Sequence, residues 1–283
     1  MGKLLAIDLD GTLFYPKGLR RKKCISKKNI RFIQDFIDAG NQVVLVTSRS
    51  SQFLEKLKDE IQRDYVTMSS NTSQIYYKGE CIREMPMNGD SLRDILDFLN
   101  NTCPPIAYLM STRDEPCIIK QNSKVGKFFA HIYHLYWKHQ RCYQEKYILD
   151  NNLFNDKLQS GDVFKVMAFF GLGRSKKKLT KELNKILREK HPNIESSWSL
   201  FVNELTAKDC NKASGLEFYI DHFNINHDDV YVIGDSGNDI SMFNKFYEHS
   251  FVMQHAYPSV KKYAKYSVSR VFKLRKYLLE GEN

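Results

Sequence analysis

The sequence predicts an α/β fold built on a parallel sheet, with an α+β domain inserted into it. Near the N-terminus, an apolar run at 4–7 is followed by a helical pattern and by a second apolar run at 43–46. The same order returns near the C-terminus, with a helical pattern at 213–223 and an apolar run at 230–233. Strands that are apolar throughout are typical of a parallel sheet buried on both faces. Both ends of the chain are therefore expected to form one sheet.

The first helix of this sheet is expected after a basic loop. Ser26 can cap its N-terminus, and Gly40, which is free to adopt a positive φ, can end it. Its apolar residues recur at helical spacing, at Ile30, Ile33, Phe36 and Ile37. Towards the C-terminus, a helix at 240–246 and a short strand at 251–253 continue the alternation.

The middle of the chain has a different pattern. Helical stretches at 91–99, 127–147 and 175–190 alternate with strand candidates at 106–111, 117–120, 163–170 and 194–202. Prolines at 86, 104, 105 and 116 interrupt the segment. We therefore expect a core formed by 1–84 and 205–283, and a separate inserted domain at 85–204.

The composition limits the classes of binding partner and the cellular locations that we expect. The chain has 283 residues, of which 43 are Lys or Arg and 33 are Asp or Glu, giving a net charge of +10. This charge is compatible with nucleic acid, an anionic membrane or an acidic substrate, but the basic residues are dispersed and form no recognised nucleic-acid motif. No apolar stretch reaches the length of a membrane span, and no signal-peptide pattern is present. We expect a cytoplasmic protein with no nucleic-acid or membrane partner; the sequence carries no signal for an oligomeric state.

The six cysteines are scattered, with no C-x-x-C pair. A disulfide-stapled secreted domain or a zinc ribbon needs closer, paired spacing. Reduced thiols are therefore expected, which agrees with a cytoplasmic location.

Two acidic loops carry the chemistry. Asp8 and Asp10 end the first strand, where residues two apart point to the same side at the carboxyl edge of the sheet. Close carboxylates repel each other unless a cation or a shared proton intervenes, and Mg²⁺ prefers oxygen ligands. Asp235 and Asp239 follow another apolar strand, so the two loops would meet around one metal ion if the strands are neighbours. The alternative is that these acids are solvated turn residues that cap helices.

Further residues complete a phosphate site. Thr47 and Ser48 end the second strand and lead into a helix, so they offer a hydroxyl and backbone N–H groups at a helix N-terminus, which suits an anion. Lys212 begins the helix before the last buried strand and supplies a positive charge; taken alone, it would be read as a surface lysine.

These motifs resemble those of the haloacid dehalogenase-like superfamily. Residues 8–14 (DLDGTLF) are similar to its first motif and residues 234–239 (GDSGND) to its fourth. Residues 46–49 (VTSR) are similar to the second motif, with Ser48 where glycine is usual, and Lys212 matches the third. The mid-chain insertion and residues 69–72 (SSNT) resemble the Cof-type branch, type IIB.

The resemblance implies a Rossmann-like core with an inserted cap domain, and a Mg²⁺-dependent phosphatase acting on small phosphorylated metabolites such as sugar phosphates. Asp8 would take the phosphoryl group as an aspartyl-phosphate, and Asp10 would act as general acid and base. Mg²⁺ would be held by Asp8, Asp235 and the backbone carbonyl of Asp10, with Asp239 supporting this shell. The groups implied to bind phosphate are Leu9 N–H, Thr47, Ser48, Lys212 and Asn238.

Two other functions remain open at this point. A phosphotransferase or mutase of the phosphomannomutase kind shares the first motif, and a phospho-acceptor regulatory module would turn Asp8 over slowly. A receiver-type module would be shorter and would have no need of Asp10.

Four further features have less specific expected roles. Thr72 and His255 depart from the family pattern, and we expect them at the rim that faces the cap, where they would bear on substrate choice. The basic loop from Lys17 to Lys23 is either a solvated loop or an electrostatic funnel. Histidines and aromatic residues between Phe128 and His139 are expected to pack in the core or to contact substrate.

Overall fold

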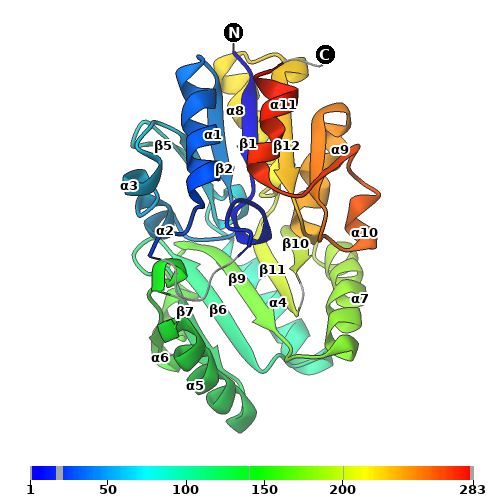
Figure 1. The fold of residues 1–283 in the computed structure, drawn as a ribbon. Helices are drawn as coiled ribbons and strands as arrows, with labels where there is room; N and C mark the ends of the chain where they lie inside the picture. The colour runs from blue at the N-terminus through cyan, green and yellow to red at the C-terminus, as the bar shows by residue number, and fades with distance from the viewer. Residues whose placement is uncertain (1, 17–21, 140, 200, 281–283) are drawn as a thin grey trace. The chain divides into compact units, whose positions relative to one another are not determined.

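The computed structural model describes residues 2–16, 22–139, 141–199 and 201–280, with the backbone alone for 133–139 and 141. The chain divides into two compact units: Met1–Arg83 with Asn211–Asn283 form the first, and Glu84–Cys210 the second. Both units contain helices and strands (Figure 1). The predicted α/β class is confirmed.

The first unit contains an eight-stranded sheet in the order β14-β13-β12-β1-β2-β3-β4-β5. The pairs from β14 to β3 are parallel, and β4 runs antiparallel to β3. Parallel strands end at one edge, so the chain leaves β1, β2, β12 and β13 on the same side of the sheet. The bounds are β1 (Leu4–Ile7), β2 (Gln42–Val46), β3 (Val66–Ser69), β4 (Gln74–Tyr77), β5 (Glu80–Glu84), β12 (Val230–Gly234), β13 (Ser250–Met253) and β14 (Tyr266–Val268).

Two long helices of this unit begin at side-chain caps. In α1 (Lys27–Asp38), the Ser26 hydroxyl accepts a hydrogen bond from Asn29 N–H, as its position in the sequence predicts. In α8 (Lys212–Phe223), Asn211 and Ser214 form a reciprocal capping box. The shorter helices are α2 (Ser51–Glu55), α3 (Lys58–Ile61), α9 (Ile240–Lys245), α10 (Pro258–Lys261) and α11 (Arg275–Leu278).

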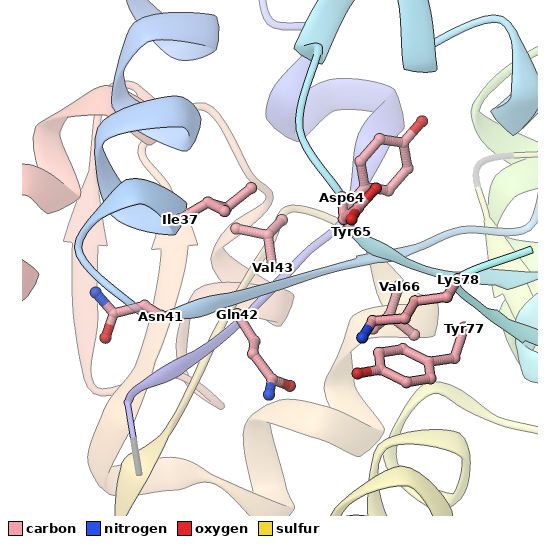
Figure 2. Close-up of a pocket in the computed structure, with 9 residues that line it drawn as sticks. All are labelled: Ile37, Asn41, Gln42, Val43, Asp64, Tyr65, Val66, Tyr77 and Lys78. Carbon is pink, nitrogen blue, oxygen red and sulfur yellow. The ribbon is translucent and has the colours of Figure 1, made fainter.

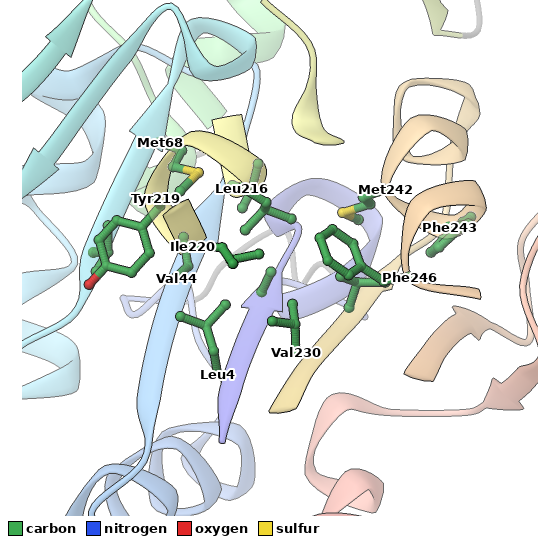
Figure 3. Close-up of a cluster of buried hydrophobic side chains, with 14 of the residues drawn as sticks. Leu4, Val44, Met68, Leu216, Tyr219, Ile220, Val230, Met242, Phe243 and Phe246 are labelled. Atoms are coloured by element: carbon green, nitrogen blue, oxygen red, sulfur yellow. The ribbon is translucent and has the colours of Figure 1, made fainter. Parts of the chain in front are cut away.

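One hydrophobic cluster of the first unit lies between the sheet and helices α8 and α9 (Figure 3). Leu216 and Ile220 of α8 and Met242 of α9 pack over Leu4 and Val230 of the neighbouring strands β1 and β12. The strand residues that point to the opposite face are buried as well, which is why these strands are apolar at every position. This packing fixes the strand ends from which the acidic loops emerge.

The second unit contains a six-stranded sheet in the order β10-β11-β9-β6-β7-β8. Every pair that we describe is antiparallel except β7 with β8. Leu99 of α4 and Leu187 of α7 pack against Tyr108 and Val166 on one face of this sheet. The elements are α4 (Gly89–Thr102), β6 (Ala107–Thr112), β7 (Ile118–Gln121), α5 (Lys124–His139), β8 (Ile148–Leu149), α6 (Asn151–Lys157), β9 (Val163–Phe169), α7 (Arg174–Lys190), β10 (Ile194–Ser199) and β11 (Val202–Ala207).

Two predicted elements of this unit were wrong in extent. The strand predicted at 194–202 is a hairpin, because the chain turns back after Ser199 and β11 pairs with both β10 and β9. The helix predicted at 127–147 ends at His139. Phe128 on this helix is 63% exposed, against the expectation of core packing, whereas the Phe129 ring packs edge-on against Phe169 at 5.8 Å. The side chains of His134 and His139 lie outside the described residues.

No disulfide joins any of the six cysteines, all of which lie in described ranges. Across those ranges, the structure contains no helix with the length and apolar character needed to cross a membrane.

Candidate active site

Three carboxylates meet at the carboxyl edge of the first sheet. Asp8 follows β1 and Asp235 follows β12, and these two strands are paired in register from Leu4 with Val230. Asp239 comes from the short turn after Asp235. One carboxylate oxygen from each of the three residues lies within 4.8 Å of the other two. The two acidic loops therefore lie next to each other because their strands are neighbours.

Lys212 is the cation of this cluster. Its side chain is fully buried, and its Nζ donates hydrogen bonds of 2.6 Å to Asp8 Oδ1 and to Asp239 Oδ1. Burial alone would lower the pKa of Lys212, but Asp239 and Asp8 outweigh it and raise that pKa above its ordinary value. The lysine is the first residue of α8, so the capping box at Asn211 fixes where its side chain starts.

Asp239 is held from both sides. Its Oδ2 accepts hydrogen bonds of 2.8 Å from the backbone N–H groups of Asp235 and Ser236, while its Oδ1 accepts from Lys212. Gly234 makes this approach possible, because a Cβ at that position would lie 2.3 Å from Asp239 Cγ. Asp239 thus fixes the backbone of the second acidic loop.

Asp235 lies directly over Gly11. A Cβ on Gly11 would lie 2.4 Å from Asp235 Oδ2, and the φ of Gly11 is +90°, so both space and conformation require glycine there. The Thr12 hydroxyl donates to Asp235 Oδ1 at 3.3 Å. The turn after Asp8 is therefore shaped to admit the carboxylate of the other loop.

The donor set suits a hard divalent cation. Three carboxylates against the single ammonium of Lys212 leave two negative charges uncompensated when all four groups are ionised. Burial raises the pKa of Asp8 well above its ordinary value, Lys212 opposes this shift, and Asp239 and Asp235 add to it. Asp8 Oδ2 is buried and has no hydrogen-bond partner among the described residues. A cation that accepts oxygen ligands would compensate this charge.

The side chain of Asp10 lies outside the three-carboxylate cluster. Its carboxylate pairs with Arg49, with Nε to Oδ2 at 2.5 Å and Nη2 to Oδ1 at 2.9 Å. The guanidinium of Arg49 also stacks over the Phe53 ring at 4.0 Å. Arg49 therefore belongs to the site, although no role was expected for it from the sequence. Its position two residues after Thr47, at the carboxyl end of β2, could have indicated that it lies near the acids.

Thr47 and Ser48 follow β2 at the same edge. The Thr47 hydroxyl is buried and accepts from Arg49 N–H at 3.2 Å. The predicted helix N-terminus at these residues was misplaced, because α2 begins only at Ser51, where the Ser50 hydroxyl caps it by accepting from Phe53 N–H. The N–H of Ser48 therefore belongs to the loop and not to a helix.

Leu9 and Asn238 flank the acids. Leu9 begins the turn η1 (Leu9–Leu13), and its side chain is fully buried. Asn238 is half-buried in the second acidic loop, and its Oδ1 accepts from the Ser236 hydroxyl at 2.7 Å. All the residues predicted for the site except Lys212 therefore lie in the loops that follow β1, β2 and β12. Lys212 lies on α8, and its side chain contacts Asp8 and Asp239.

Thr72 is buried beside the first turn of α8. It is fully buried in a loop where Ser70, Asn71 and Thr72 all have positive φ, between +49° and +73°. Its hydroxyl donates to the Asn211 carbonyl at 2.9 Å. A Cβ on Gly215 of α8 would lie 2.3 Å from Thr72 Cβ. Thr72 thus packs against the first turn of the helix that carries Lys212.

The basic loop and a cavity are two further features of the first unit. Residues 17–21 of the basic loop lie outside the described residues, and Lys22 and Lys23 are exposed. A cavity of about 170 Å³ lies at the opposite edge of the sheet, near Gln42 and Val66 at the starts of β2 and β3 (Figure 2). Since the acids lie at the carboxyl edge, this cavity is separate from them.

Comparison with known proteins places the chain in a family. The sequence profile of haloacid dehalogenase-like hydrolases matches residues 5–271. An uncharacterised protein of Mycoplasma capricolum is 24% identical to this chain, and the alignment covers 97% of this chain and 100% of that protein. The Bacillus subtilis protein YwtE, a 5-amino-6-(5-phospho-D-ribitylamino)uracil phosphatase, is 24% identical over 92% of this chain and 90% of its own.

Solved structures share the fold. A haloacid dehalogenase-like hydrolase from Bacillus subtilis superposes with a TM-score of 0.78 at 20% identity, over 98% of this chain and 100% of that one. BT4131, a sugar phosphatase of subclass IIB, superposes with a TM-score of 0.73 at 20% identity, and the superposition covers 97% of this chain and 98% of BT4131. The profile match spans both acidic loops, the loop after β2 and Lys212. This chain belongs to the haloacid dehalogenase-like hydrolase family.

Proposed function

We propose that the protein is a Mg²⁺-dependent phosphatase that hydrolyses small phosphorylated metabolites through an aspartyl-phosphate on Asp8. The observation that carries this proposal is the buried Asp8, whose Oδ1 is held by Lys212 while its Oδ2 has no hydrogen-bond partner among the described residues. The names of two relatives support it, since YwtE is a phosphatase of a phosphorylated ribitylamino compound and BT4131 is a sugar phosphatase.

In the first step, Asp8 Oδ2 attacks the phosphorus atom of the substrate. A bond forms between this oxygen and phosphorus, and the bond from phosphorus to the ester oxygen breaks. The leaving oxygen takes a proton from the carboxyl group of Asp10 and departs as an alcohol. Lys212 keeps the Asp8 side chain oriented throughout, because it holds the other carboxylate oxygen at 2.6 Å.

In the second step, the Asp10 carboxylate takes a proton from water. The resulting hydroxide oxygen attacks phosphorus, the bond to Asp8 breaks, and inorganic phosphate leaves with Asp8 restored. Arg49 contacts both oxygens of Asp10. Asp10 has to give a proton to the leaving oxygen and later take one from water. One of its two hydrogen bonds with Arg49 must break for this, so Arg49 fixes the position of the Asp10 carboxylate before substrate binds.

The remaining site residues bind the phosphoryl group and the cation. We infer that Thr47, Ser48, the N–H of Leu9, Lys212 and Asn238 surround the phosphoryl oxygens. Asp8, Asp235 and the backbone carbonyl of Asp10 would hold Mg²⁺, with Asp239 fixing the loop behind them. When bound, Mg²⁺ neutralises charge on the transferring group and on the clustered carboxylates.

We also infer that the inserted unit, Glu84–Cys210, selects the substrate. It interrupts the first unit between β5 and α8 and has a sheet and a core of its own. An insertion of this kind leaves the acidic loops intact while its own residues vary, which is how one reaction centre serves different phosphate esters.

The test of the proposed function is phosphate release from a panel of sugar phosphates and related esters, with and without Mg²⁺. We expect release to require the cation and to stop with excess EDTA, then to return when Mg²⁺ is added back, because two carboxylate charges otherwise lack a counterion. A parallel assay for isomerised phosphate ester distinguishes a mutase, which would form isomer without releasing phosphate. Full release in EDTA would contradict the proposed metal dependence.

Asp10→Asn is expected to lower kcat by about 10²–10⁴-fold, the range that general acid–base catalysis contributes. An amide at this position cannot give a proton to the leaving alcohol or take one from water. We expect the loss to be smaller with an aryl phosphate, since its leaving group needs less protonation than an alkyl one. Steady-state kinetics on both substrate types measures this difference, and an unaltered kcat on both would remove Asp10 from the acid–base role.

A further inference from the structure

His255 reaches the acidic cluster from a third strand. It lies in the loop after β13, which pairs in parallel with β12, so its loop leaves the sheet at the edge that carries Asp235. Its Nε2 lies 3.6 Å from Asp235 Oδ2, and its side chain is 30% exposed. The ring of His255 therefore approaches one of the three clustered carboxylates.

The ring of His255 is held by the first acidic loop. It stacks on Tyr15, with ring centroids 3.8 Å apart and planes 19° from parallel. The guanidinium of Arg270 lies 4.7 Å from the centroid of the same tyrosine ring. Tyr15 in turn is joined to η1, since its N–H donates to the Thr12 carbonyl at 3.2 Å. These contacts fix the plane of the imidazole and direct Nε2 towards Asp235.

The carboxylate of Asp235 is contacted on both oxygens. Thr12 Oγ1 donates to Oδ1 at 3.3 Å, and His255 Nε2 faces Oδ2. The two hydrogen bonds from Asp235 and Ser236 N–H to Asp239 hold the backbone of the loop and do not involve the Asp235 carboxylate. Thr12 and His255 are therefore the contacts that set the plane of this carboxylate.

We propose that His255 is a positioning residue that orients Asp235 as a ligand for the divalent cation. The proposal rests on the metal site of the proposed function. A carboxylate whose plane is already fixed loses less rotational freedom when it binds a cation. In this proposal His255 acts through the approach of its Nε2 to Asp235 Oδ2.

The test is the affinity of the substrate-free protein for Mn²⁺, followed by electron paramagnetic resonance of the free ion. We expect His255→Ala to raise the Kd for Mn²⁺ about 10- to 100-fold, as for other partners of metal ligands. His255→Gln should return the Kd to near the wild-type value, because the Gln side-chain amide nitrogen reaches about as far as Nε2. The matched control is His249→Ala: His249 precedes β13 and stacks on Tyr231 at 4.4 Å, and we expect an unchanged Kd.

Three results would overturn the proposal, and they differ in what else they overturn. A wild-type Kd in a folded His255→Ala protein shows that His255 does not orient Asp235, while the phosphatase proposal stands. A Kd for His255→Gln as weak as that of the alanine variant shows that the ring stack, and not the N–H donor, matters. Equal Mn²⁺ binding by wild type and Asp235→Asn removes the metal site itself, and with it the metal dependence of the proposed function.

Discussion

Asp8→Asn should abolish hydrolysis, with kcat on p-nitrophenyl phosphate lower by about 10⁴-fold or more, as when the nucleophile of other covalent mechanisms is removed. The Asn amide cannot form the acyl phosphate that the proposed reaction needs. The remaining geometry stays in place, because Asn Oδ1 can still accept from Lys212 Nζ, which lies 2.6 Å from Asp8 Oδ1 in the wild type. The expected result is thus an inactive protein with a normal fold.

Two measurements separate chemistry from folding in this variant. Thermal unfolding should give a Tm close to that of the wild type, since one buried acidic group is replaced by a neutral one of the same shape. Asp228→Asn is the control, because Asp228 is exposed in the turn before β12 and should change neither kcat nor Tm. Turnover at the wild-type rate in Asp8→Asn would show that another residue takes the phosphoryl group.

The elements that carry the site were predictable because their signals are local. Runs such as 43–46 are apolar on both faces, and a strand buried on both sides of a parallel sheet requires that. Ser26 is an ordinary N-cap, and the structure uses it as one. Acids that directly follow two parallel neighbouring strands lie at the same edge of the sheet. The proximity of Asp8 and Asp235 could therefore be predicted from their positions after two apolar strands.

Contacts between distant residues were not predictable in the same way. Nothing near Arg49 in the sequence identifies Asp10 as its partner, because that pair depends on how two loops approach each other over β1 and β2. The burial of Thr72 was not predictable for the same reason, since it comes from packing against α8. The hairpin of β10 and β11 was read as one strand, because Leu200 and Phe201 between the strands are apolar and carry no turn signal.

Lys212→Met is expected to be the most destabilising of the proposed substitutions. Methionine has a similar length but no charge, so it would leave the Asp8 and Asp239 carboxylates buried without their cation. Removing one partner of a buried ion pair costs about 3–5 kcal/mol, because the charge that is left lies uncompensated in the interior. Hydrolysis should be lost as well, since Asp8 is no longer held. Urea unfolding of the metal-free protein measures the difference in free energy of unfolding.

The pH dependence of this loss follows from the carboxylates. Without Lys212, the pKa of Asp8, already raised by burial, rises further, so the folded state binds a proton more readily than the unfolded state. The lost stability should therefore be recovered as the pH falls through the folded pKa of Asp8, and recovery should be fullest below the ordinary value for an aspartate. Lys208→Met, at an exposed position four residues earlier, should behave as wild type at every pH. A free energy of unfolding for Lys212→Met equal to that of this control would contradict the expectation that Lys212 compensates buried negative charge in this cluster.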